Sequence, residues 1–158
     1  MNCHVNAHSG SQTAPPGGGP LTLRMRITSD PRLLCVVRST VSELATVCGF
    51  EDEQRRRITL AVDEALSNVM RHAYKNRRDQ EIELSCQVCS DCLEFSFIDR
   101  GEAADRSRIC AQPLDEIATG GRGTHLIRQI MDEVCYDQVS EGNRLRLKKY
   151  LPCIKSKA

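Results

Sequence analysis

Residues 58–74 read ITLAVDEALSNVMRHAY, and this stretch predicts a long amphipathic helix. Its apolar side chains recur at intervals of three and four residues, which places them on one helix face. These positions are Ile58, Val62, Leu66, Val69 and Ala73. We expect the helix to run from about residue 51 to residue 74, with its apolar face against a hydrophobic core.

The residues before this helix predict a strand and a first helix. Apolar and polar side chains alternate strictly over residues 21–27, a pattern typical of a half-buried strand. Asp30 and Pro31 predict a helix start, because Asp is a preferred N-cap and Pro fits the first helical position. Gly49 predicts the end of that helix.

Strands and one more helix are expected downstream. The strand patterns cover residues 82–88, 93–98, 134–139 and 144–151, and a third helix is expected after Gly121, Arg122 and Gly123. Grouped helices combined with hairpin strands predict an α+β fold. We expect a two-layer sandwich in which the helices cover one face of a mostly antiparallel, mixed sheet.

Composition and charge limit the domain organisation and the class of partner. The run of Pro and Gly within residues 14–20 predicts a disordered tail over 1–20, which leaves a domain at 21–152 and a short tail at 153–158. The net charge of +1 gives no indication of a nucleic-acid or anionic-membrane surface. No segment approaches the roughly 20 apolar residues of a membrane span, and no secretory signal is visible. The cysteines are therefore expected as thiols in a cytoplasmic protein.

Glu64 and Asn68 are the first candidate site residues. They are four residues apart and so share a helix face, away from the apolar stripe. A carboxylate can accept a proton from a hydroxyl group, and an amide oxygen can ligate Mg²⁺. Taken alone, this pair is more typical of an ordinary solvated helix face.

Asp99 and Gly101 form a second candidate site, at the end of the apolar strand 93–98. A carboxylate there could accept the exocyclic amine of adenine, while a glycine allows the backbone to approach a base closely. An ordinary turn is the alternative, because Asp and Gly are common turn residues.

Residues 120–123, Gly-Gly-Arg-Gly, form a third candidate site at a helix start. Backbone N–H groups at such a start can bind phosphate, although a flexible linker has the same composition. The stretch lacks the Gly-Lys-Ser/Thr of a P-loop. The polar residues 102–119 before it are long for a structureless loop and predict either a lid over a nucleotide or local disorder.

Together, these motifs resemble those of the GHKL (Bergerat-fold) ATPases. Within that family, the chain is most similar to the anti-sigma-factor serine kinases of bacterial partner-switching systems. Residues 62–74 match the family's N-box, residues 99–101 match its first glycine box, and residues 120–134 match its second. The resemblance covers about residues 21–151 and implies a Bergerat-type α/β sandwich that binds ATP and Mg²⁺.

The resemblance implies a role for each matching residue. Glu64 would be the general base that activates the acceptor serine, Asn68 would hold Mg²⁺, and Asp99 would bind the adenine amine. Arg71 and His72 would reach the nucleotide or brace the lid. The remaining positions would shape the pocket and the phosphate-binding helix start, and they are Gly101, Gly121, Arg122, Gly123 and Thr124.

The implied activity is that of a protein serine kinase and anti-sigma factor. Its partners would be a sigma factor and an anti-sigma-factor antagonist of the STAS type, whose serine it would phosphorylate. Members commonly dimerise, although no sequence feature here requires a homodimer. The alternative is a nucleotide-gated binding module with negligible catalysis, which uses ATP to order its lid and present a surface to a partner.

Three cysteines form a separate motif. Cys86, Cys89 and Cys92 have the spacing C-x2-C-x2-C across the expected hairpin. Zinc coordination would need a fourth ligand, for which Cys110, Cys135 and Cys153 are candidates, and redox sensing is the other possible role of the motif. The alternation of the strand makes Cys86 a small core residue instead.

Overall fold

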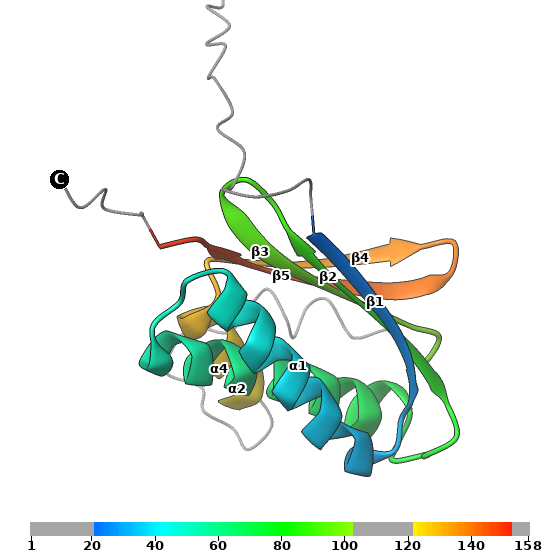
Figure 1. Ribbon diagram of the computed structural model, residues 1–158. Helices are drawn as coiled ribbons and strands as arrows, with labels where there is room; N and C mark the ends of the chain where they lie inside the picture. The colour runs from blue at the N-terminus through cyan, green and yellow to red at the C-terminus, as the bar shows by residue number, and fades with distance from the viewer. Residues whose placement is uncertain (1–20, 103–121, 153–158) are drawn as a thin grey trace, which may run out of the picture.

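The computed structural model describes residues 21–102 and 122–152, which form a single antiparallel sheet with helices on one face (Figure 1). The strands are β1 (Leu21–Thr28), β2 (Glu81–Val88), β3 (Cys92–Asp99), β4 (Glu133–Val139) and β5 (Gly142–Tyr150). The helices are α1 (Leu34–Val47), α2 (Asp52–Asn68) and α4 (Arg122–Ile130). The expected tails at 1–20 and 153–158, and most of the expected lid, lie outside the described residues.

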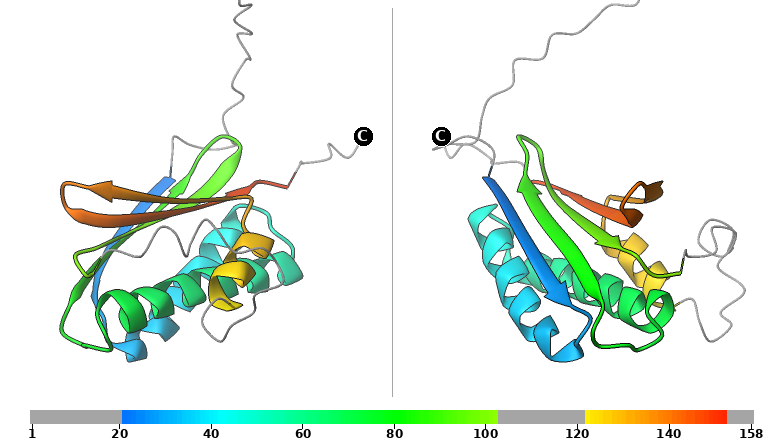
Figure 2. Two further views of the ribbon diagram at one scale, coloured as in Figure 1. Left: turned by 180° about the vertical axis from the view of Figure 1, so that it is seen from behind. Right: turned by 90° about the vertical axis from the view of Figure 1, so that its right-hand side faces the viewer.

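The five strands have the order β1-β2-β3-β5-β4, and every pairing between them is antiparallel. Both views in Figure 2 show the helices on the same side of the sheet. The predicted α+β sandwich is therefore confirmed, and the sheet formed by the described strands is antiparallel throughout. Strand β3 is the central strand of the sheet, so the residues at its ends are flanked by neighbouring strands on both sides.

The buried core lies between the sheet and the helices. Helices α1 and α2 contribute the apolar stripes expected from their spacing, and β2, β3 and β5 contribute alternating apolar residues. The largest fully buried side chains include Phe95, Phe97, Ile58, Leu66 and Ile127. This packing fixes α2 against the sheet, which places the candidate residues of α2 near one end of it.

The start of the first helix is close to its prediction. The Asp30 carboxylate accepts the Arg32 backbone N–H at 3.0 Å, and Pro31 occupies the first helical position. The first turn, Pro31–Leu33, is a 3₁₀-helix, and the α-helix begins at Leu34. Gly49 has a φ of +79°, a left-handed conformation that ends α1 as expected.

The second helix differs from its prediction at its C-terminal end. The α-helix ends at Asn68 and continues as a wider π-helical turn, Val69–Ala73. The Tyr74 N–H donates to the Val69 carbonyl at 3.1 Å, a bond across five residues that the regular 3.6-residue period does not predict. This turn buries Val69, Met70 and Tyr74 together, and Lys75 and Asn76 then leave it with positive φ.

Within the described ranges 21–102 and 122–152, the helices are too short or too polar to cross a lipid bilayer.

Candidate functional site

Glu64, Asn68 and Arg71 form a hydrogen-bonded cluster at the end of α2. Arg71 Nη2 donates to Glu64 Oε1 at 2.9 Å and to Asn68 Oδ1 at 3.0 Å. Arg71 Nε donates to the Ser67 carbonyl at 3.3 Å, which holds the guanidinium against the helix. Because one nitrogen atom binds both oxygens, the proposed base and the proposed metal ligand lie next to each other.

Glu64 also contacts the beginning of α4. A Cβ atom added to Gly123 would lie 1.9 Å from Glu64 Oε1, closer than any real contact. A side chain at position 123 would therefore displace the Glu64 carboxylate from this place. The N-terminus of a helix carries a partial positive charge and free N–H groups, which favour an anion such as this carboxylate or a phosphate.

Asp99 lies at the end of β3, where its carboxylate accepts two hydrogen bonds. Its side chain is only 7% exposed. Oδ1 accepts the Gly101 backbone N–H at 2.9 Å and Asn143 Nδ2 at 3.0 Å. Burial raises the pKa of the Asp99 carboxyl above its ordinary value, and these two hydrogen bonds oppose that shift. The carboxylate is therefore held in one orientation, with its acceptor capacity only partly used.

Gly101 brings the first glycine box against α2. A Cβ atom at this position would lie 2.5 Å from the Ala73 carbonyl oxygen, so the backbone approach requires glycine. The next residue, Glu102, donates its N–H to the same oxygen at 3.1 Å. The end of β3 and the π-helical turn after α2 are thus joined directly, which places Asp99 and the Glu64 cluster on the same side of the molecule.

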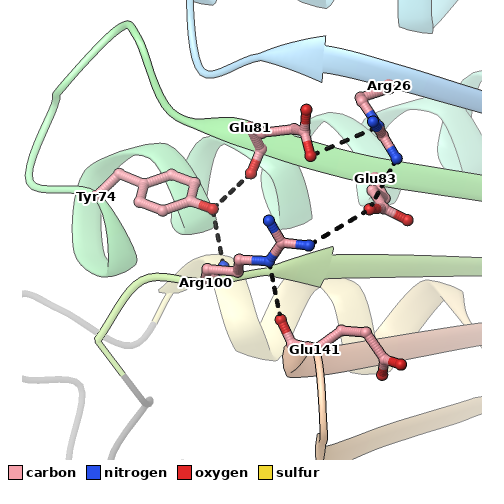
Figure 3. A network of polar contacts seen from close by, with 6 residues as sticks. All are labelled: Arg26, Tyr74, Glu81, Glu83, Arg100 and Glu141. Atoms are coloured by element: carbon pink, nitrogen blue, oxygen red, sulfur yellow. Dashed lines mark hydrogen bonds and ion pairs between the residues drawn. The ribbon is translucent and has the colours of Figure 1, made fainter.

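Figure 3 shows the polar contacts that hold Arg100 between these elements. The Tyr74 hydroxyl donates to the Glu81 carbonyl at 2.5 Å and accepts the Arg100 N–H at 2.9 Å. The Arg100 side chain donates to the Glu141 carbonyl at 3.3 Å and lies 4.0 Å from Glu83. Burial raises the pKa of Tyr74, so this hydroxyl stays protonated and can donate.

Two surface hollows are found among the described residues. One has a volume of about 380 Å³ and lies at the Asp99 end of the sheet, lined by Arg100, Gly101 and residues 138–143. The other has a volume of about 500 Å³, lies between α1 and α2, and is lined mainly by polar residues such as Arg38 and Asp63. Only the first adjoins the predicted glycine box.

The structure brings most of the predicted residues to one side. Glu64, Asn68 and Arg71 form the first group, and Asp99 and Gly101 form the second. Gly123 and Thr124 lie in the first turn of α4, and Arg122 begins that helix. His72 is exposed on the π-helical turn. Gly121 and most of the expected lid, residues 103–119, lie outside the described residues.

Two contributors to this site were not assigned a role from the sequence. Asn143 appears in the sequence as a residue of the Glu141-Gly142-Asn143 turn, yet its amide binds Asp99. Tyr74 was part of the N-box match without a role, yet its hydroxyl fixes Arg100. Neither residue carries a local signal, because each contact joins segments far apart in the chain.

The residues present fit a nucleotide with its metal ion. Asn68 Oδ1 is a hard oxygen ligand of the kind that Mg²⁺ accepts, and Arg71 now donates a cationic N–H to it. A cation could replace the guanidinium without leaving Asn68 unpaired. The Gly123 contact places the start of α4 close to this point, where phosphate oxygens would add negative charge.

Among the described residues, the three cysteines of the motif do not converge on one position. Within residues 21–102 and 122–152, no group of three or more His, Cys, Asp or Glu side chains could hold a metal ion. Cys86 faces the helices as part of the hydrophobic core, as the alternation predicted. Cys92 is six residues later but on the other strand of the hairpin, and its side chain points to the opposite face of the sheet. Zinc binding by Cys86, Cys89 and Cys92 together is therefore excluded.

Comparison with known proteins identifies the family. The model of the histidine kinase-like ATPase domain family matches residues 27–149. The chain is similar to the serine-protein kinase RsbW of Oceanobacillus iheyensis, with 29% identity over 82% of this chain and 86% of the relative. The serine-protein kinase RsbW of Listeria monocytogenes is 30% identical over 82% of this chain and 87% of the relative.

A solved structure supports the fold. The RsbU and RsbW domains of Rv1364c from Mycobacterium tuberculosis superpose with a TM-score of 0.60 and 16% identity, over 83% of this chain and 32% of that one. At this identity the likeness concerns the arrangement of helices and strands alone.

Proposed function

We propose that this protein is a Mg-ATP-dependent protein serine kinase, because the chain belongs to the family of histidine kinase-like ATPase domains. The family match implies ATP binding. The kinase activity and the Mg²⁺ ion are the further parts of the proposal. They are supported by the side chains at the end of α2 and by similarity to serine-protein kinases.

One observation carries the proposal. Glu64 Oε1 and Asn68 Oδ1 both bind Arg71 Nη2, at 2.9 and 3.0 Å. Phosphoryl transfer depends mainly on positioning and charge neutralisation, with a base near the metal-bound phosphate. A carboxylate next to a metal-ligating amide provides that arrangement on one helix face.

The residues of the site would divide the work as follows. Both described hydrogen bonds of the Asp99 carboxylate end on Oδ1. The other oxygen, Oδ2, would accept the exocyclic amine of adenine and so orient the base. Asn68 would hold Mg²⁺, which supplies positive charge to the phosphates when bound. Glu64 would accept the proton of the acceptor serine as the serine oxygen attacks the γ-phosphorus of ATP and ADP leaves. The start of α4 at Gly123 would provide backbone N–H donors.

Arg71 would have to leave Asn68 when the metal binds. A guanidinium released next to the phosphates can form charge-assisted hydrogen bonds with them. We therefore expect Arg71→Met to weaken Mg-ATP binding by about tenfold, or about 1.4 kcal/mol. Arg38→Met, on α1, is the control, since Arg38 pairs with Asp63 outside this cluster. Tighter binding by Arg71→Met would mean that Arg71 only competes with the metal.

The protein partners are proposed from the relatives. By analogy with the serine-protein kinases RsbW, the acceptor would be a serine of a STAS-type anti-sigma-factor antagonist, and the competing partner a sigma factor. The protein would act in the cytoplasm, where both partners are found. A homodimer is compatible with this scheme and is tested by sedimentation.

The decisive experiment measures transfer of labelled γ-phosphate to such an antagonist. Glu64→Gln should lower the transfer rate by about 10² to 10⁴-fold, the usual contribution of a general base. Its affinity for Mg-ATP should stay within about twofold, because the base does not need to bind the nucleotide. Glu43→Gln, an exposed carboxylate on α1, is the matched control. Unchanged transfer by Glu64→Gln would remove Glu64 as the base.

A second candidate function is favoured by the same ion pair. Arg71 occupies Glu64 Oε1 at 2.9 Å, so this oxygen is already bonded to a cation, as expected of a nucleotide-gated binding module without catalysis. In that case, Mg-ATP would be needed to retain the partner, and no phosphorylated partner would form. Mass spectrometry of the retained partner distinguishes the two functions.

A further inference from the structure

The turn between β2 and β3 brings two cysteines opposite each other. Val88 pairs with Leu93 in the antiparallel register, so Cys89 and Cys92 are the next facing pair. Only Ser90 and Asp91 separate them. The Cys89 N–H donates to the Cys92 carbonyl at 2.8 Å, which closes the turn.

The backbone pairing of Cys89 and Cys92 is compatible with a disulfide. Directly opposed residues that share such a hydrogen bond have Cα atoms about 5.5 Å apart. Disulfides join Cα atoms that are about 4.4 to 6.8 Å apart. The Cα separation expected for this pair is therefore within the range that a disulfide spans.

Cys86 does not compete for either thiol. It is buried in the core cluster between the sheet and the helices, whereas Cys92 is outside that cluster. Cys89 is half-buried, so a small reagent can reach it, and Cys92 is only 3% exposed. The hairpin thus presents one accessible thiol with a second, shielded thiol behind it.

We propose that Cys89 and Cys92 are a redox-active dithiol, which forms a reversible disulfide by exchange with a low-molecular-weight disulfide. The turn lies at the opposite end of β3 from Asp99, so this site is separate from the proposed nucleotide site and does not depend on it (Figure 1).

The exchange takes two steps. The Cys89 thiolate attacks one sulfur of the external disulfide, forms a mixed disulfide and releases one small thiolate. The Cys92 sulfur, losing its proton to solvent, then attacks the Cys89 sulfur and releases the second small thiolate. The protein loses two electrons and two protons, and the external disulfide becomes two thiols. Burial raises the pKa of Cys92 to about 12, which assigns the first attack to Cys89.

The test uses the full chain equilibrated in mixtures of reduced and oxidised glutathione. After the free thiols have been alkylated, trypsin cleavage at Arg78 and Arg100 releases residues 79–100, which contain all three hairpin cysteines. We expect oxidised samples to give a peptide that is alkylated only at Cys86. Its mass should be two hydrogens below that of the same peptide with two free thiols. Dithiothreitol should restore three alkylated cysteines.

Two variants assign the bond. Cys86→Ala should form the same crosslink, and Cys89→Ser should lose it, with circular dichroism confirming that both variants fold. Fragment ions of the wild-type peptide locate the bond even if a variant does not fold. Alkylation of Cys89 and Cys92 under the most oxidising mixture would overturn the proposal. So would a bond from Cys92 to Cys86 or Cys153.

Discussion

The two ends of strand β3 each bury a titratable side chain, but in different surroundings. Asp99 has hydrogen bonds from Gly101 and Asn143, and burial raises the pKa of its carboxyl. Cys92, at the other end, is buried beside Cys89, and its pKa rises to about 12. Keeping a carboxylate buried requires converging donors, whereas a thiol needs none.

The Asp99 end is also where separate segments meet most closely. A Cβ atom at Gly101 would collide with the Ala73 carbonyl, and one at Gly142 would lie 2.1 Å from the Asp99 carbonyl oxygen. The Cys92 end is a hairpin turn between consecutive strands, joined to the end of β5 by the Leu151 N–H, which donates to the Asp91 carbonyl at 2.8 Å. We infer that changes at the Asp99 end affect both stability and nucleotide binding, and that changes at the Cys92 end affect stability without changing nucleotide binding.

The largest difference is expected when the two buried side chains are truncated. Asp99→Ala leaves the part-buried Gly101 N–H without its acceptor, at about 1–3 kcal/mol, whereas Asn143 Nδ2 keeps its bond to the Gly101 carbonyl at 3.1 Å. Cys92→Ala removes one small apolar group, at about 1 kcal/mol. Urea unfolding measures both free energies. Titration with a fluorescent ATP analogue should show lost affinity for Asp99→Ala only, and equal affinities would contradict the comparison.

The glycine contact gives the next largest effect. Gly101→Ala places a methyl group 2.5 Å from the Ala73 backbone oxygen, and such overpacking costs about 1–3 kcal/mol. Gly49→Ala is the control, because its added Cβ meets no atom within 4 Å although its φ is +79°. Gly49→Ala should lower the unfolding free energy by about 1 kcal/mol and leave ATP binding unchanged. Weakened ATP binding in both variants would indicate a general loss of folding.

Tyr74 tests the connection between the π-helical turn and Arg100. Tyr74→Phe removes the hydroxyl that donates to Glu81 and accepts from Arg100, so the unfolding free energy should fall by about 1–2 kcal/mol. Tyr150→Phe, at the other end of the sheet, removes an exposed hydroxyl that contacts Glu133 and should cost less than about 0.5 kcal/mol. Thermal unfolding of both variants checks the difference, and equal costs would mean that the Tyr74 bonds contribute nothing beyond a surface contact.

The smallest effect concerns pH. Burial raises the pKa of Asp99 in the folded chain, so its contribution to stability is fully present below the unfolded pKa of about 4. That contribution is lost as pH rises through the folded pKa. The unfolding free energy of wild type minus that of Asp99→Asn should therefore decrease as pH rises above about 4.

Asp137 supplies the opposite case. Its hydrogen bond from Arg144 lowers its pKa, so its contribution is present above the unfolded pKa and lost as pH falls through the folded pKa. Wild type minus Asp137→Asn should therefore decrease towards acid pH. Urea titrations at several pH values give both differences, and slopes of the same sign would refute the assignment for Asp99.

The motifs within single elements were predictable from the sequence. Glu64 and Asn68 share a face because they are four residues apart on a helix, and the period of the helix fixes this wherever the helix packs. The strand alternation placed Cys86 in the core for the same reason. The exit from α2 was not predictable, because the π-helical turn depends on burying Val69, Met70 and Tyr74 against the sheet.

The sequence by itself therefore determined the helices, the strands, the α+β class and the residues of three motifs, since each depends on backbone period or local turn chemistry. Only the tertiary structure decided that Arg71 binds both Glu64 and Asn68, that Asn143 binds Asp99, and that Cys89 faces Cys92. The Asn143 contact spans 44 residues, and its geometry depends on strand register and helix packing. Those follow from burying all the apolar faces at once, which no local pattern encodes.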